Sequence, residues 1–116
     1  MYTVVIGRFQ PLHNGHVWLI EEALKEGHPV LVLVRDDGGP YLPGERIDWI
    51  HQVFEDRPVT AVAFPDVAGV IYGRGVGYKV QELPECPIKG ISGTAIREKA
   101  EGWEQMVPEA VRRGIT

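Results

Sequence analysis

The chain has 116 residues, of which 44% are hydrophobic and 24% charged, and its formal net charge at pH 7 is −4. This size and composition are typical of one soluble globular domain over residues 1–116, and its single cysteine excludes an internal disulfide. The negative charge argues against general binding to nucleic acid or an anionic membrane, no apolar run is long enough to span a bilayer, and no secretory signal is visible, so we expect a cytoplasmic protein.

The first half of the chain predicts alternating strands and helices. Unbroken apolar runs at residues 3–6, 30–34 and 59–64 are typical of buried parallel strands. Apolar residues at helical spacing over 14–26 and 43–56 predict two helices, the first of them ended by Gly27, and residues 35–40 form a loop rich in Asp and Gly. This alternation indicates an α/β protein, a Rossmann-like three-layer sandwich with a mostly parallel sheet.

The second half predicts a shorter series of elements. Residues 67–72 form an expected fourth strand and residues 77–83 a fifth, separated by a loop around Gly73 and Gly75. A helix is expected to start at Ser92 and end near Gly102, and a last helix to cover 103–113 with an interruption at Pro108. Ligands in such sheets bind outside the carboxyl ends of the strands, which is where both motifs described next are expected.

The first motif, Gly-Arg-Phe-Gln-Pro-Leu-His-Asn-Gly-His at residues 7–16, directly follows the first strand. His13 and His16 are three residues apart, so both face the same side of the helix that begins there, where backbone N–H groups and the helix dipole favour an anion. Gly15 leaves room beside the backbone for a phosphate or base, and Gly7 allows close approach to the strand end. Arg8 is expected to point across the phosphate site, although a surface cation is the plainer alternative.

The second motif, Ile-Ser-Gly-Thr-Ala-Ile-Arg at residues 91–97, has the features of another helix start. Ser92 and Thr94 carry hydroxyls suited to the first turn, and Arg97 lies one turn further on, where its guanidinium has the geometry to grip phosphate oxygens. Two such helix starts in one small α/β domain indicate a polyphosphate held between them.

Together the two motifs resemble those of the HxGH nucleotidyltransferase superfamily, and within it they most resemble the archaeal-type nicotinamide mononucleotide adenylyltransferases. The resemblance implies transfer of AMP from ATP to a phosphate monoester, with nicotinamide mononucleotide favoured and NAD and pyrophosphate as products. It also implies Mg²⁺ bound mainly through the ATP phosphates and no metal-ligating side chains. Phe9 and Ile91 are assigned to nucleotide binding as members of the two motifs. The stretch Pro-Gly-Glu-Arg-Ile at 43–47 is similar to an Ala-Gly-Glu-Arg-Ile stretch of the family, which implies that Arg46 reaches the substrate phosphates.

In this interpretation His16 stabilises the α-phosphoryl transition state, and His13, Ser92, Thr94 and Arg97 hold the triphosphate. Arg8 and Arg46 orient the incoming phosphate, which is already an anion and needs no general base. Arg74, between two glycines, is either a clamp on a substrate phosphate or a turn residue.

The chain is shorter than the archaeal-type enzymes around its third and fourth strands, which leaves the acceptor open. Pantetheine phosphate or a phospho-alcohol is the alternative acceptor, CTP the alternative donor, and a non-catalytic ATP-binding module the alternative class. Self-association is common in the superfamily, so a homo-oligomer is expected, with no nucleic-acid or membrane partner.

Overall fold

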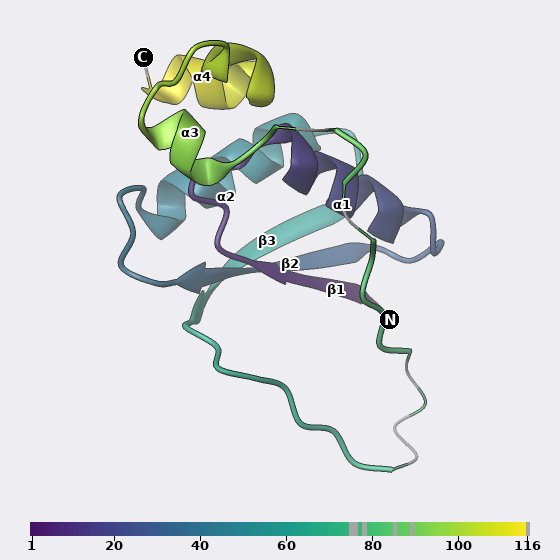
Figure 1. The fold of residues 1–116 in the computed structure, drawn as a ribbon. Helices are drawn as coiled ribbons and strands as arrows, with labels where there is room; N and C mark the ends of the chain where they lie inside the picture. The colour runs from purple at the N-terminus through teal and green to yellow at the C-terminus, as the bar shows by residue number, and fades with distance from the viewer. Residues whose placement is uncertain (75–76, 78, 85, 89, 116) are drawn as a thin grey trace.

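A computed structural model of the chain describes residues 1–74, 77, 79–84, 86–88 and 90–115. Its first 65 residues form a β-α-β-α-β unit: β1 (Thr3–Gly7), α1 (Asn14–Leu24), β2 (Val30–Asp36), α2 (Pro43–Val53) and β3 (Val59–Pro65). The three strands are parallel in the order β1-β2-β3, with Val5 opposite Val32 and Val32 opposite Ala61. The predicted α/β class with a parallel sheet is therefore confirmed, and the sheet is open at both edges (Figure 1).

The hydrophobic core lies between the sheet and helices α1 and α2, which cover the same face (Figure 1). Successive residues of a strand point to opposite faces, so Val30, Val32 and Val34 of the central strand all meet this core and are fully buried. Ile20 of α1 and Ile50 of α2 are buried against them. The opposite face carries partly exposed apolar side chains, and no helix among the described residues covers it, so the second helical layer of the predicted sandwich is not seen there.

The prediction of a fourth strand at residues 67–72 was wrong, because the structure gives this segment no regular secondary structure. Only Asp66 separates it from the end of β3 at Pro65, whereas a parallel partner needs a crossover of about a dozen residues to return to the start of the sheet. Part of the predicted fifth strand, including Tyr78, lies outside the described residues, and residue 77 and residues 79–83 have no regular secondary structure.

The C-terminal part is α3 (Gly93–Arg97), a 3-10 turn η1 (Trp103–Met106) and α4 (Glu109–Ile115). The predicted interruption at Pro108 is confirmed, while α3 ends well before Gly102. In Figure 1, α3 lies over the loop that leaves β1, and this places the second motif beside the first. In the part of the chain that the structure describes, no helix has the length and apolar character needed to cross a membrane.

Candidate functional site

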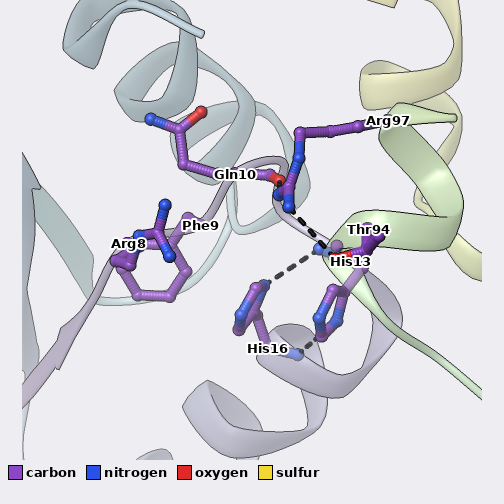
Figure 2. Close-up of a pocket in the computed structure, with 8 residues that line it drawn as sticks. Arg8, Phe9, Gln10, His13, His16, Thr94 and Arg97 are labelled. Carbon is purple, nitrogen blue, oxygen red and sulfur yellow. Dashed lines mark hydrogen bonds between the residues drawn. The ribbon is translucent and has the colours of Figure 1, made fainter. Parts of the chain in front are cut away.

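Two histidines build the N-terminus of α1 by capping it reciprocally. The Nδ1 atom of His13 accepts hydrogen bonds from the backbone N–H groups of Gly15, at 3.1 Å, and His16, at 3.4 Å. The Nδ1 atom of His16 accepts in turn from the backbone N–H of His13 at 3.1 Å. The two rings stack with centroids 3.7 Å apart (Figure 2). Because each Nδ1 is an acceptor, each ring carries its proton on Nε2, and both rings line the same pocket as hydrogen-bond donors.

Both histidines are neutral at physiological pH in this arrangement. Burial lowers the pKa of His13 from 6.5 to about 4, although a backbone hydrogen bond opposes part of this shift. Burial, followed by the neighbouring charge of His13, lowers the pKa of His16 from 6.5 to about 3. The positive charge of the pocket therefore comes from arginines, and the histidines supply neutral N–H donors.

The glycines of the first motif make room for the side chains around the pocket. A Cβ at Gly7 would lie 2.8 Å from the ring of Phe9, and a Cβ at Gly15 would lie 2.9 Å from the ring of His13. Phe9 is buried, adopts a positive φ of 54° and packs edge-on against His16 with centroids 4.8 Å apart. These contacts fix the ring of His16, so Phe9 both lines the cavity and supports His16, while Gly7 makes room for Phe9.

Arg97 joins the second motif to the first. Its Nη1 donates to the backbone oxygen of Gln10, and its Nη2 donates to the hydroxyl of Thr94 at 3.2 Å (Figure 2). Gly93 permits this approach, because a Cβ there would lie 2.9 Å from Arg97 Nη1 and 3.0 Å from the Gln10 oxygen. Ser92 caps the short helix by accepting from the N–H of Ala95 at 3.0 Å.

These groups enclose a cavity of about 240 Å³ between the loop after β1 and the start of α3. It is lined by Arg8, Phe9, Gln10, His13, His16, Gly93, Thr94 and Arg97. A second cavity of about 300 Å³ shares His13 with the first and also has Gly15, Cys86, Ile88 and Ile91 in its wall. Among the described residues, the lining of the first cavity has cationic and N–H donors and no carboxylate, which is the chemistry of an anion site.

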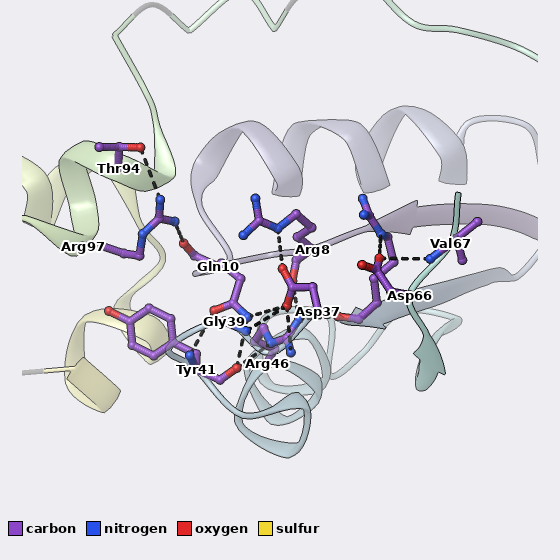
Figure 3. Close-up of polar contacts among 11 residues, drawn as sticks. Arg8, Gln10, Asp37, Gly39, Tyr41, Arg46, Asp66, Val67, Thr94 and Arg97 are labelled. Atoms are coloured by element: carbon purple, nitrogen blue, oxygen red, sulfur yellow. Dashed lines mark hydrogen bonds and ion pairs between the residues drawn. The ribbon is translucent and has the colours of Figure 1, made fainter. Parts of the chain in front are cut away.

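A network of polar contacts supports the pocket from below (Figure 3). The carboxylate of Asp37, in the loop after β2, pairs with Nε of Arg8 and accepts from Nε2 of Gln10 at 3.0 Å. Arg46 is fully buried and donates to the backbone oxygens of Tyr41 at 3.0 Å, Arg8 at 2.6 Å and Arg35 at 2.9 Å. Burial alone raises the pKa of Asp37, but hydrogen bonds from Arg8, Gln10 and the N–H of Gly39 outweigh it and hold the pKa at about 2.

The structure brings most of the predicted site residues together. Six of them line the first cavity: Arg8, Phe9, His13, His16, Thr94 and Arg97. Ile91 and Gly15 face the second cavity, and Ser92 acts as a helix cap. Arg46 lines neither cavity and binds backbone oxygens instead of facing a substrate phosphate, because the carbonyls at the ends of β1 and β2 surround its guanidinium. Arg74 is exposed and lines neither cavity.

Sequence reasoning missed three residues of the site. Gln10 and Gly93 lie inside the two motifs, so their positions were a usable signal, and their contacts with Arg97 give each a specific role. Asp37 lies in a loop whose only visible feature was its Asp and Gly content, and nothing in its spacing connects it to Arg8, 29 positions earlier.

Comparisons with known proteins find similar sequences. A family described as cytidylyltransferase-like matches residues 4–41, the segment that holds β1, the two histidines and β2. A nicotinamide-nucleotide adenylyltransferase of Picrophilus torridus is 27% identical over 99% of this chain and 90% of its own length. Proteins of the same name from Thermoplasma volcanium and Methanospirillum hungatei are 28% and 29% identical, over 92% and 97% of this chain and 81% and 86% of their own lengths.

The chain resembles the archaeal nicotinamide-nucleotide adenylyltransferases. The resemblance inferred from the two motifs is thereby confirmed. The comparison also confirms that this chain is a shortened form: its alignment with the Picrophilus protein extends over 154 positions, 38 more than the 116 residues of the chain.

Proposed function

We propose that this chain is a nucleotidyltransferase that moves AMP from ATP to a phosphate monoester and releases pyrophosphate, with nicotinamide mononucleotide as the favoured acceptor. The observation that supports this most strongly is the convergence of both motifs on one cavity. His13 and His16 direct N–H donors at it from α1, and Arg97 reaches it from α3 while bonded to the loop of the first motif. The archaeal relatives, which bear the name of such an enzyme, align over nearly the whole chain.

The proposed reaction is a displacement at the α-phosphorus. An oxygen of the acceptor phosphate forms a bond to the α-phosphorus of ATP, the bond from that phosphorus to the bridging oxygen of the β-phosphate breaks, and pyrophosphate leaves with the electron pair. The acceptor is already an anion, so the neutral state of both histidines suits a role as hydrogen-bond donors and no base is required. Arg97 and Thr94 would hold the β and γ phosphates, His16 the α-phosphoryl group, and Arg8, on the other side of the cavity, the acceptor (Figure 2).

Magnesium would enter this site as part of the MgATP substrate. Among the described residues there is no group of three or more His, Cys, Asp or Glu side chains that could hold a metal ion. Mg²⁺ keeps several water ligands and binds readily through phosphates, so the triphosphate suffices to carry it.

The second cavity supports a nucleotide as the ligand. It shares His13 with the first cavity, and Ile88 and Ile91 in its wall would give a nucleobase an apolar surface while the phosphates lay beside the histidines. This arrangement does not choose between adenine and cytosine. Transfer from CTP, transfer to pantetheine phosphate or a phospho-alcohol, and ATP binding without turnover remain the alternatives.

Pyrophosphate release tests the proposal directly. Wild-type protein is assayed with Mg²⁺ and either ATP or CTP, against nicotinamide mononucleotide, pantetheine phosphate and phosphocholine, with His16→Ala as the matched inactive variant. Release with ATP and nicotinamide mononucleotide that disappears in His16→Ala is the expected result. Release with another pair would retain the chemistry and replace the substrate, and no release from any pair by a protein that still binds ATP would contradict catalysis.

A further inference from the structure

Asp37 is a charged group outside the two motifs that contacts the cavity-lining residues Arg8 and Gln10. Its side chain is 6% exposed and pairs with Nε of Arg8, whose own side chain is 53% exposed. The same carboxylate accepts from Nε2 of Gln10 at 3.0 Å and from the N–H of Gly39 at 3.3 Å. Arg46 Nη2 lies 3.8 Å from it. A buried carboxylate that bonds an exposed arginine is held by the protein, so the arginine is the partner whose position it determines.

We propose that Asp37 is a positioning residue that aims the terminal amino groups of Arg8 at the phosphate of the acceptor. The inference rests on the proposed function and adds a residue that neither motif contains. An arginine side chain has several freely rotating bonds, and a half-exposed one samples many rotamers unless something fixes it. Pairing through Nε is a side-on contact that leaves both Nη groups of Arg8 available for two phosphate oxygens (Figure 3).

The carboxylate is itself immobilised by a chain of hydrogen bonds. The backbone N–H of Tyr41 donates to Oε1 of Gln10 at 3.0 Å, and Nε2 of Gln10 donates to the Tyr41 oxygen at 3.2 Å as well as to Asp37. Gln10 also accepts from Arg97 through its backbone oxygen. One residue of the first motif therefore touches both the group that orients Arg8 and the arginine assigned to the triphosphate.

The local charge remains favourable for a phosphate. Asp37 contributes one negative charge, and Arg8 and Arg46 contribute two positive ones, so the group as a whole attracts an anion. Because Arg46 is buried behind the carboxylate, Arg8 alone of these two arginines lines the cavity. Loss of the Asp37 charge would release Arg8 without removing it.

The test compares Asp37→Asn with Asp36→Asn, which removes the same charge from the exposed neighbouring residue, and with Arg8→Ala. We expect Asp37→Asn to raise the KM for the acceptor about tenfold, since hydrogen bonds to charged groups have about this effect, while ATP affinity changes less than about twofold. Asp36→Asn should leave both unchanged. In an Arg8→Ala background, Asp37→Asn should have no further effect on the acceptor KM. If Asp37 had only a structural role, the substitution would change the acceptor KM in this background as well.

Three results would overturn the inference: an unchanged acceptor KM in folded Asp37→Asn, an equal loss of ATP affinity, or additive effects of the two substitutions. If Asp37→Asn does not fold, Arg8→Lys serves instead. Asp37 would capture its single ammonium group, so its acceptor KM should rise as in Arg8→Ala, and a wild-type KM would overturn the inference.

Should the wild-type protein show no turnover, the proposed function fails by itself, and titration with inorganic phosphate by calorimetry then tests Asp37. Equal weakening of phosphate binding in Asp37→Asn and Arg8→Ala supports positioning, and wild-type phosphate affinity in either variant refutes it.

Discussion

Gly93→Ala tests the contact between Arg97 of the second motif and Gln10 of the first. An added Cβ would lie 2.9 Å from Nη1 of Arg97 and 3.0 Å from the backbone oxygen of Gln10. The arginine is the far end of a flexible side chain, so it moves first, and its hydrogen bond to Gln10 is lost. Alanine is otherwise favoured over glycine in a helix by up to about 1 kcal/mol, which offsets part of the lost hydrogen bond, so the free energy of unfolding should fall by no more than about 2 kcal/mol.

The expected effect is on ATP binding. If the displaced Arg97 loses one charge-assisted hydrogen bond to the triphosphate, the loss corresponds to about 1.5–3 kcal/mol, or roughly a 10- to 100-fold rise in the Kd for ATP. Gly44→Ala is the matched control, because nothing lies within 4 Å of a Cβ at that helical position. Calorimetric titration with MgATP measures both variants, and urea unfolding confirms that both are folded.

Gly93→Ala with the ATP affinity of wild type and of Gly44→Ala would refute the reasoning. Arg97→Ala gives a second check. If Arg97 acts through its fixed position, the double variant Gly93→Ala, Arg97→Ala should bind ATP no more weakly than Arg97→Ala alone.

Three further predictions concern the histidines and the buried arginine. His16→Ala should lower kcat by at least about 100-fold and, because half of the reciprocal cap is lost, reduce the free energy of unfolding by about 1 kcal/mol, while exposed His28→Ala should retain wild-type kcat in the same pyrophosphate assay. Because the pKa of His13 is about 4 and that of His16 about 3 in the folded protein, against 6.5 unfolded, the unfolded chain binds more protons below pH 6.5. Stability should therefore be complete above pH 6.5 and fall toward pH 4, by up to about 1.4 kcal/mol per pH unit for each histidine, and a flat urea midpoint over this range would contradict the burial. Arg46→Met should reduce the free energy of unfolding by about 3–5 kcal/mol, since three buried carbonyl oxygens lose their donor, whereas a stable variant with a raised substrate KM would assign Arg46 to the substrate.

Local sequence patterns were sufficient to predict the strands and helices of the first 65 residues and the two histidines of the pocket. Apolar runs located β1, β2 and β3 within one or two residues, because buried parallel strands need such runs. The spacing of His13 and His16 placed both rings on one face of α1, and the capping hydrogen bonds follow from that spacing. The second motif likewise predicted the start of α3 at Ser92.

The predictions that were wrong or missing concern features that depend on contacts between distant parts of the chain. Residues 67–72 have strand-like composition, but pairing needs a connection long enough to return to the sheet, and local composition carries no information about this. Arg46 is a residue type that is normally exposed, and its burial depends on carbonyl oxygens from three separate segments. Asp37 meets Arg8 only because β1 and β2 are adjacent, so no spacing in the sequence marks the pair.

The measurement that tests the central claim most directly is the fate of a phosphorus label. ATP labelled at the α-phosphorus and, separately, at the γ-phosphorus is incubated with wild-type protein and nicotinamide mononucleotide, and the products are separated. Attack at the α-phosphorus predicts that the α label appears in NAD and the γ label in pyrophosphate, with neither transfer in His16→Ala. Transfer of the γ label to the acceptor, or α label that stays entirely in ATP, would contradict the account.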